Sequence, residues 1–148
     1  FSAVEIEKIV IVEPNIIRRK YLNENCDVVA VEKVDESFSI VVDAVGFKKT
    51  RELASEKVST GGVITHIGLG EDLGGIDVRR ITLQEVSFIG TYTYTAQDFK
   101  ETAKAIFDGR LGPLDWVERR PLSEGSRAFS EIREGKVASP KIVLSPND

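Results

Sequence analysis

The sequence predicts an α/β fold in which helices cover both faces of a parallel sheet. Short runs of consecutive apolar, largely β-branched residues recur along the chain, as is typical of strands buried on both faces. Between these runs lie segments whose apolar residues have the spacing of amphipathic helices. Such alternation of strand and helix favours crossover connections and hence a parallel sheet. At 148 residues the chain has about the length of one domain.

The first half of the chain is expected to hold four strands and two helices. The β-branched run from Lys8 to Glu13 is followed by Pro14, which favours a turn. Good helix formers follow Thr50, and Gly61-Gly62 is expected to end that helix. The expected strands are 8–13, 27–31, 38–43 and 63–67, and the expected helices are 16–22 and 50–58.

The second half is expected to add two strands and two helices. An apolar strand at 86–92 is followed by an amphipathic helix at 97–107. A last helix is expected at 126–134 and a final strand at 141–144, whereas residues 75–78 look extended.

Composition excludes several classes of partner. A net charge of −4 and a pI near 5.2 remove the electrostatic basis for binding nucleic acid. No apolar run approaches the ~20 residues that cross a bilayer, so no membrane partner is expected. The single Cys26 cannot form an internal disulfide, which favours a cytoplasmic location. Cys26 and His66, the only histidine, cannot alone make a conventional zinc site.

Ligands of open α/β sheets bind outside the carboxyl ends of the strands, and those ends therefore predict the site. Glu13 stands at such an end, where it could accept two hydrogen bonds from a ribose diol or remain a solvated acid. Arg18 could reach the same ribose or lie on a solvated helix face. Asp43 could bind loop amides or face the ligand. His66 is either a hydrogen-bonded core residue or a general base.

The glycine-rich stretch from Gly68 to Gly75 does not match the dinucleotide-binding pattern, because Leu73 stands where a small residue is needed. It is either a flexible loop or a loop whose backbone amides face a ligand. No Ser/His/Asp or Cys/His set, metal-ligand cluster or P-loop is evident, so no catalytic or metal-ligating residue is expected in this chain.

The same segments resemble the carboxyl-terminal part of the zinc-containing alcohol dehydrogenases of the medium-chain dehydrogenase/reductase family. Six stretches occur in the family's order and cover nearly the whole chain. They are Ile9–Asn15, Val41–Gly46, Gly61–Leu69, Phe88–Tyr92 with Asp98-Phe99, Pro121–Phe129 and Lys141–Leu144. The resemblance implies a Rossmann-like sheet, and residues 1–148 would form a partial dinucleotide-binding domain without the family's catalytic domain.

The resemblance also implies a set of cofactor contacts. Glu13 would bind the adenosine ribose hydroxyls and favour NAD over NADP, with Arg18 beside it. The other implied contacts are Val45 and Gly46 near the adenine ribose, Ile67, Gly68 and Leu69 at the nicotinamide end, Thr91 and Tyr92 continuing that wall, and Lys141 near the pyrophosphate. The strand around Val86–Gly90 would pair across a homodimer axis, in a dimer or a tetramer. The intact parent would use zinc and NAD to oxidise an alcohol or polyol.

The sequence departs from the family in two ways. It lacks the zinc-binding catalytic domain and the first strand with its G-x-G-x-x-G turn. We therefore expect part of a longer dehydrogenase, inactive alone, with a gap between the strand ending at Glu13 and the one ending at Asp43. Two alternatives remain open: a receiver-like signalling module with Asp43 as phosphoacceptor, or a non-catalytic nucleotide-binding or dimerisation domain.

Overall fold

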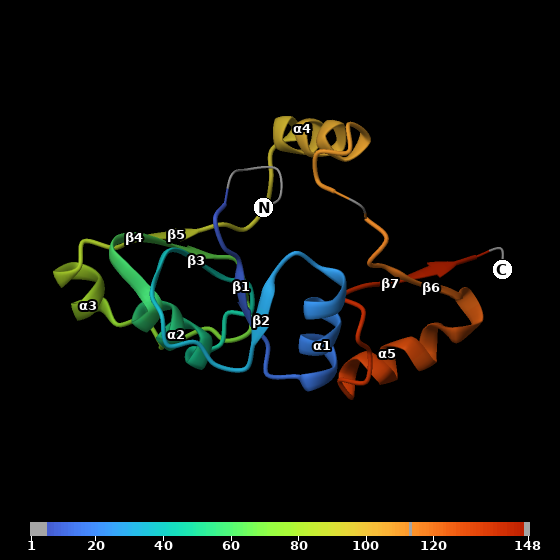
Figure 1. The fold of residues 1–148 in the computed structure, drawn as a ribbon, viewed down its shortest axis with the longest axis horizontal. Helices are drawn as coiled ribbons and strands as arrows, with labels where there is room; N and C mark the ends of the chain where they lie inside the picture. Colours follow the sequence, from blue (N-terminus) through green and yellow to red (C-terminus); the bar gives the residue numbers. More distant parts are fainter. Residues whose placement is uncertain (1–5, 113, 147–148) are drawn as a thin grey trace. The chain divides into compact units, whose positions relative to one another are not determined.

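The computed structural model describes residues 6–112 and 114–146 (Figure 1). Residues 35–95 form one compact unit, and the described residues of 1–34 and 96–148 form another. The helices and strands are β1 Val10–Val12, α1 Ile16–Asn25, β2 Val29–Val31, β3 Phe38–Asp43, α2 Lys48–Lys57, β4 Val58–His66, α3 Val78–Leu83, β5 Ser87–Gly90, α4 Ala96–Phe107, β6 Glu118–Pro121, the 3₁₀ turn η1 Leu122–Glu124, α5 Gly125–Arg133 and β7 Ile142–Ser145. Every described strand pair is parallel, which confirms the predicted α/β class.

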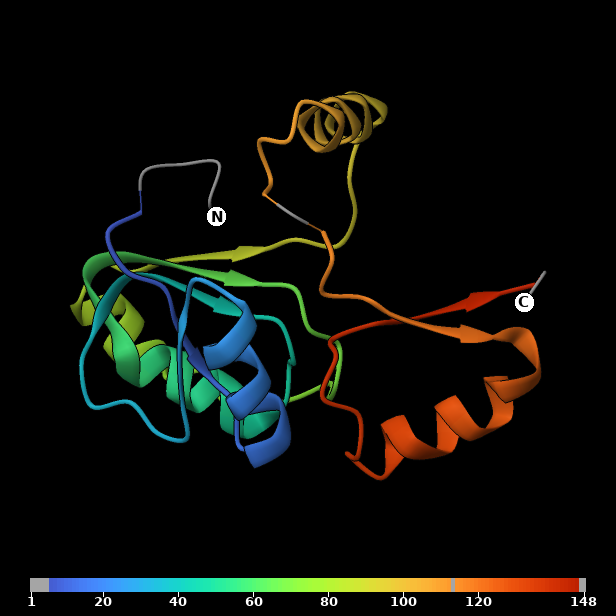
Figure 2. The same ribbon diagram turned by 45° about the vertical axis from the view of Figure 1, so that its right-hand side comes forward.

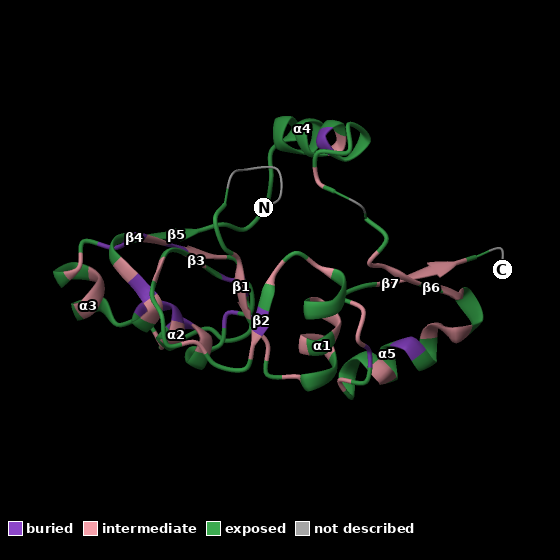
Figure 3. Ribbon diagram, in the orientation of Figure 1, coloured by how far each residue is buried: buried purple, intermediate pink, exposed green. Residues whose placement is uncertain are grey.

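In the unit of residues 35–95, a parallel sheet has the order β3-β4-β5. Helices α2 and α3 lie on the same side of this sheet in both ribbon views (Figures 1 and 2). The core lies between sheet and helices, where Ala54 of α2 packs with Val58 and Ile64 of β4 and with Val86 (Figure 3). Burial of Ile64, which has no exposed surface, fixes which face of β4 meets α2.

Strand β4 begins earlier than the sequence suggested. The predicted helix end at Gly61-Gly62 is wrong, because α2 ends at Lys57 and β4 runs through both glycines. The pairing with β3 shifts register between Phe38 and Ile40, and Gly61 has φ +70° there. A Cβ on Gly62 would come within 2.8 Å of the Ser39 carbonyl oxygen, so the bulged strands approach closely at this glycine.

One α-helix and one strand were not predicted. Residues 75–78 look extended in the sequence, but helix α3 begins at Val78 after Asp77, whose side chain accepts a hydrogen bond from the Arg80 N–H at 2.9 Å. Strand β6 has the polar sequence Glu-Arg-Arg-Pro and pairs in parallel with β7. Its pairing partner, rather than its own composition, makes it a strand.

In the other unit, β1 pairs in parallel with β2, and α1 connects the two strands. The side chain of Asn15 caps α1 by accepting the N–H groups of Ile17 and Arg18. The same side chain donates to the Gly135 carbonyl at 2.9 Å, and the Tyr21 hydroxyl donates to the Trp116 carbonyl at 3.0 Å. These bonds join α1 to the segments that flank β6 and α5.

The described strands form three separate sheets: β1-β2, β3-β4-β5 and β6-β7. None of the described helices combines the length and the apolar character needed to cross a bilayer.

Acid should weaken the packing of β6 against α5. Arg120 donates from Nη1 to Glu131 Oε2 at 2.6 Å and from Nε to Glu118 Oε1 at 2.6 Å. The hydrogen bond from Arg120 lowers the pKa of the Glu131 carboxyl below its ordinary value. A carboxyl with a lowered folded-state pKa contributes stability that is complete above its unfolded pKa and is lost as the pH falls through the folded value.

We therefore expect the urea concentration at the midpoint of unfolding to decrease as the pH is lowered below about 4. This decrease should be smaller in Glu131→Gln. Urea denaturation followed by circular dichroism from neutral to acid pH measures both effects. The matched control is Asp115→Asn, since Asp115 is an exposed carboxylate that precedes β6. If the urea midpoint decreases equally steeply with falling pH in wild type and in Glu131→Gln, the expectation is contradicted.

Candidate functional site

The turn after β3 is organised by the Asp43 carboxylate. Asp43 is 5% exposed, and its Oδ1 accepts the N–H groups of Val45 at 3.0 Å and Gly46 at 2.9 Å. Its Oδ2 lies 3.1 Å from the Thr50 hydroxyl of α2. Of the two roles open to Asp43, the geometry supports binding of loop amides. Because the carboxylate is buried and both oxygens are engaged, it is not presented as a phosphoacceptor, and the receiver interpretation lacks support.

The loop after β4 continues the pairing of the two strands beyond their ends. The N–H groups of Ile67 and Gly68 donate to the Asp43 carbonyl, at 2.9 and 3.1 Å. The N–H of Gly70 donates to the Val45 carbonyl at 3.1 Å, and that of Glu71 to the Gly46 carbonyl at 2.9 Å. Four residues predicted near a cofactor, Val45, Gly46, Ile67 and Gly68, are therefore brought together within one unit.

Two glycines allow this approach. Gly46 has φ +76°, and a Cβ built on it would lie 2.1 Å from the Gly68 carbonyl oxygen. A Cβ on Gly68 would lie 2.1 Å from the Val45 carbonyl carbon. Distances this short are excluded for real atoms, so each backbone occupies the space that a side chain on the other would need.

The hydrogen bonds decide which backbone groups remain for a ligand. Because the amides of Ile67, Gly68, Gly70 and Glu71 all bind the turn, this part of the loop does not form an amide cradle. Among the described residues, the Leu69 N–H and the Ile67 carbonyl have no hydrogen-bond partner. The Leu69 side chain is 77% exposed. The Leu69 N–H donor and the Ile67 carbonyl acceptor thus lie on adjacent peptide groups and are both available to a ligand.

The end of β5 adds the third segment of this site. The Thr91 N–H donates to the His66 carbonyl at 2.9 Å, so residue 91 follows the edge of β4. Tyr92 is 83% exposed. The three strand ends of the unit thus lie side by side, as the rule for parallel sheets predicts.

His66 is a half-buried histidine whose buried Nε2 lacks the hydrogen bond expected of a core residue. Its Nε2 lies 3.5 Å from Asp43 Oδ2, on the neighbouring strand, but makes no hydrogen bond in the described part of the chain. Its ring centroid lies 5.5 Å from that of Phe88 on β5. No carboxylate near it in the sequence pointed to this arrangement, because Asp43 reaches His66 only through strand pairing.

Arg51 is a site residue that the sequence did not reveal. It is 5% exposed and lies in α2, and its guanidinium group donates to four backbone carbonyls. The acceptors are Gly46 at 2.7 Å, Glu71 at 3.0 Å, Leu73 at 2.8 Å and Gly74 at 2.5 Å. The loop from Gly68 to Gly75 is therefore fastened to α2, against the interpretation of it as a flexible loop.

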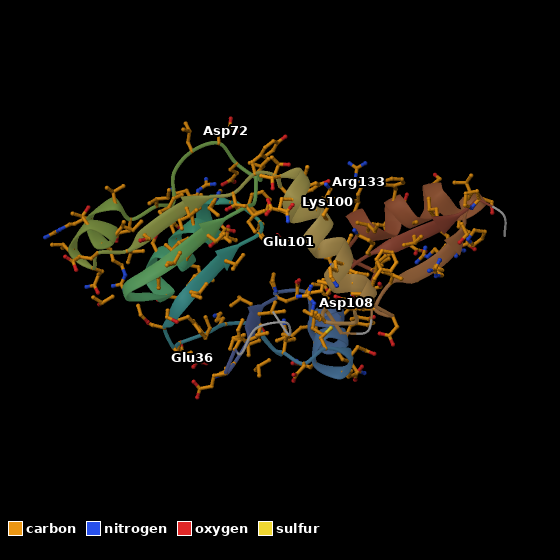
Figure 4. All side chains as sticks on the ribbon, turned by 90° about the horizontal axis from the view of Figure 1, so that it is seen from above. Glu36, Asp72, Lys100, Glu101, Asp108 and Arg133 are labelled. Atoms are coloured by element: carbon orange, nitrogen blue, oxygen red, sulfur yellow. The ribbon has the colours of Figure 1, made fainter. Side chains whose placement is uncertain are left out.

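A cavity of about 550 Å³ adjoins this loop. His66 and Phe88 of the sheet, Arg51 of α2 and the loop residues 68, 69, 71–74 and 76 line it. Asp72 lies at the outer bend of the loop (Figure 4). The volume of this cavity is within the range of small-molecule pockets, about 300–1,000 Å³.

The sequence predicted Glu13 as the last residue of the first strand, and in the structure Glu13 directly follows β1. Its Oε1 accepts the Asn15 N–H at 2.8 Å, and Oε2 has no hydrogen-bond partner among the described residues. The Arg18 backbone is held by Asn15, but it is Arg19 that binds this turn, donating to the carbonyls of Glu13 at 2.6 Å and Pro14 at 3.1 Å. Arg19 also lies 3.5 Å from Glu32, after β2.

The last predicted contact, Lys141, precedes β7 and is exposed. Its carbonyl accepts the Glu118 N–H at 3.0 Å. Glu13, Arg18 and Lys141 belong to one unit, and the residues around Asp43 and Gly68 belong to the other.

The described residues do not fit a zinc site. In residues 6–112 and 114–146, no three His, Cys, Asp or Glu side chains are grouped so that they could hold a metal ion. Cys26 and His66 lie in different units. The carboxylates of Glu13 and Asp43 bind backbone amides of their own turns.

Comparison with known proteins finds dehydrogenases among the matches. No protein-family model matches the chain. The (R,R)-butanediol dehydrogenase of Saccharomyces cerevisiae is 26% identical over an alignment of 122 residues that covers 78% of this chain and 32% of that protein. The chain thus spans about a third of the length of this curated relative.

Solved structures share the fold. The L-idonate 5-dehydrogenase of Escherichia coli superposes with a TM-score of 0.76 at 18% identity, over 96% of this chain and 44% of that one. The acetophenone reductase of Geotrichum candidum, solved in complex with NAD, gives a TM-score of 0.73 at 22% identity, over 91% of this chain and 40% of that one.

The Rossmann-like dehydrogenase fold is thus confirmed, and the curated relative is itself a dehydrogenase. These matches agree with the predicted resemblance of the chain to the carboxyl-terminal part of a medium-chain dehydrogenase/reductase.

Proposed function

We propose that the intact protein is a zinc-containing, NAD-dependent dehydrogenase of alcohols or polyols, and that this chain holds part of the cofactor. The proposal rests mainly on one observation: the ends of β3, β4 and β5 lie side by side. Hydrogen bonds made by Asp43, Gly68 and Thr91 hold the segments that follow these strands. Parallel α/β sheets bind their ligands at this edge. NAD, when bound, supplies the hydride acceptor.

Glu13 is proposed to bind the adenosine ribose. Its Oε1 is held by the Asn15 N–H, which leaves Oε2 to accept from a ribose hydroxyl. Arg19 holds the Glu13 and Pro14 carbonyls and so fixes the turn that carries the carboxylate. A carboxylate repels a 2′-phosphate, which is the basis for proposing NAD rather than NADP.

The loop after β4 is proposed to bind the nicotinamide end. A carboxamide both donates and accepts hydrogen bonds, and it matches the Ile67 carbonyl and the Leu69 N–H. Val45 and Gly46, Thr91 and Tyr92, Arg18 and Lys141 keep the cofactor roles predicted for them. Zinc would be held by the family's catalytic domain, since the described residues offer no ligand set, and we propose that this chain alone has no turnover.

The remaining parts of the proposal concern partners and location. We propose a homodimer or homotetramer formed through β5, an edge strand of its sheet whose residues 87–90 are all exposed. A cytoplasmic location is also proposed, on the single cysteine.

Glu13→Gln should weaken NAD binding by about tenfold, because it replaces a charge-assisted hydrogen bond with a neutral one. Saturation-transfer NMR of the chain with NAD, in a concentration series, measures the affinity and resolves adenosine from nicotinamide protons. The loss is expected mainly at the adenosine ribose, and the preference for NAD over NADP should shrink.

Glu7→Gln is the matched control, because Glu7 is an exposed carboxylate just before β1. Its affinity for NAD should equal that of the wild-type chain. Equal affinity of Glu13→Gln and wild type would show that Glu13 does not bind the cofactor.

A further inference from the structure

One buried cation joins three segments of the unit 35–95. Arg51 in α2 donates to the carbonyl of Gly46, in the turn after β3, and to those of Glu71, Leu73 and Gly74, in the loop after β4. Gly75 allows the loop to come this close, because a Cβ there would lie 2.3 Å from the Lys48 carbonyl oxygen and 2.9 Å from Arg51 Cβ.

The acceptors are all neutral carbonyl groups. No carboxylate forms a salt bridge with Arg51 among the described residues, and the carboxylate of nearby Glu71 instead accepts the Lys48 N–H at 2.6 Å. A guanidinium group presents five N–H donors in a rigid fork, and four hydrogen bonds to divergent carbonyls use that geometry. A lysine has three donors on a single nitrogen and cannot reproduce this set.

We infer that Arg51 is a positioning residue for the cofactor, because it holds the loop 67–74 against the turn 43–47. This inference rests on the proposed function. Arg51 acts through the backbone: it fixes the carbonyls of residues 71, 73 and 74 and so the course of the loop that carries Leu69 and its free N–H. The same guanidinium binds Gly46, so both predicted cofactor segments share one anchor.

The test compares Arg51→Lys, Arg51→Met and the control Arg79→Met in the full chain. Arg79 is an exposed arginine of α3 in the same unit, so its loss removes a charge without removing the anchor. Hydrogen exchange read by mass spectrometry should show segment 67–76 exchanging at least ~10-fold faster in Arg51→Lys, whereas 58–66 in β4 stays as protected as in wild type. Arg79→Met should match wild type in both segments.

Saturation-transfer NMR with NAD supplies the readout that a merely structural role would not move. In Arg51→Lys the signal of the nicotinamide protons should fall by about fivefold or more relative to that of the adenine protons, because only the nicotinamide segment loses its anchor. A uniform loss at both ends, or an unchanged ratio together with faster loop exchange, overturns the positioning role.

The remaining outcomes are also decisive. Unchanged exchange of 67–76 in both Arg51 variants overturns the inference outright. If Arg51→Met fails to fold, Arg51→Lys decides, because it keeps the charge and most of the volume. If the wild-type chain binds no NAD, the proposed function fails in its binding step; the loop exchange then still shows whether Arg51 holds the loop, while its cofactor role falls with the function.

Discussion

Gly68→Ala is expected to lower the free energy of unfolding by about 3 kcal/mol or more, the range of severe overpacking. The added Cβ would lie 2.1 Å from the Val45 carbonyl carbon and 2.3 Å from the Gly46 nitrogen, both backbone atoms. Neither can rotate away as a side chain does, so the loop must leave the turn and give up its four backbone hydrogen bonds. Urea denaturation followed by circular dichroism measures the loss.

The matched control is Gly90→Ala, at the end of neighbouring β5. A Cβ on Gly90 meets nothing within 4 Å, and its φ is not in the left-handed region. This variant should stay within about 0.5 kcal/mol of wild type, as surface substitutions usually do. Equal stability of the two variants would mean that the turn and the loop do not touch as described.

Asp43→Ala should cost about 3 kcal/mol. It leaves the N–H groups of Val45 and Gly46 without their acceptor, and each unsatisfied buried group costs about 1–3 kcal/mol. The Thr50 hydroxyl loses its contact with Asp43 but keeps the Phe47 carbonyl as an acceptor. Asp43→Asn keeps one carbonyl oxygen for the two amides and should lose only about 1 kcal/mol. The same urea denaturation distinguishes the two variants.

Asp35→Ala is the control for Asp43→Ala, since Asp35 is an exposed aspartate of the same unit. It should be close to wild type in stability. If Asp43→Ala were as stable as Asp35→Ala, the Asp43 carboxylate would not organise the turn.

Much of the fold could be predicted because its signals are local. The run ending in Asp43 predicted β3 at its observed bounds, and the first helix began at Ile16 as expected. Apolar runs identify buried strands, and parallel pairing follows from their alternation with helices. Strand β6 was not predicted, because Glu-Arg-Arg-Pro has no strand pattern. The start of β4 was predicted too late in the sequence, because Gly-Gly usually ends a helix or strand.

By itself, the sequence determined the α/β class, the parallel pairing of the strands and the strand ends near Glu13 and Asp43. These features depend on residues adjacent along the chain. Only the tertiary structure decided how those ends are held. Arg51 meets carbonyls up to 23 positions away, and Asp43 meets His66 across a strand pair. The interlocking of Gly46 with Gly68 likewise depends on two loops meeting in space, which no local pattern encodes.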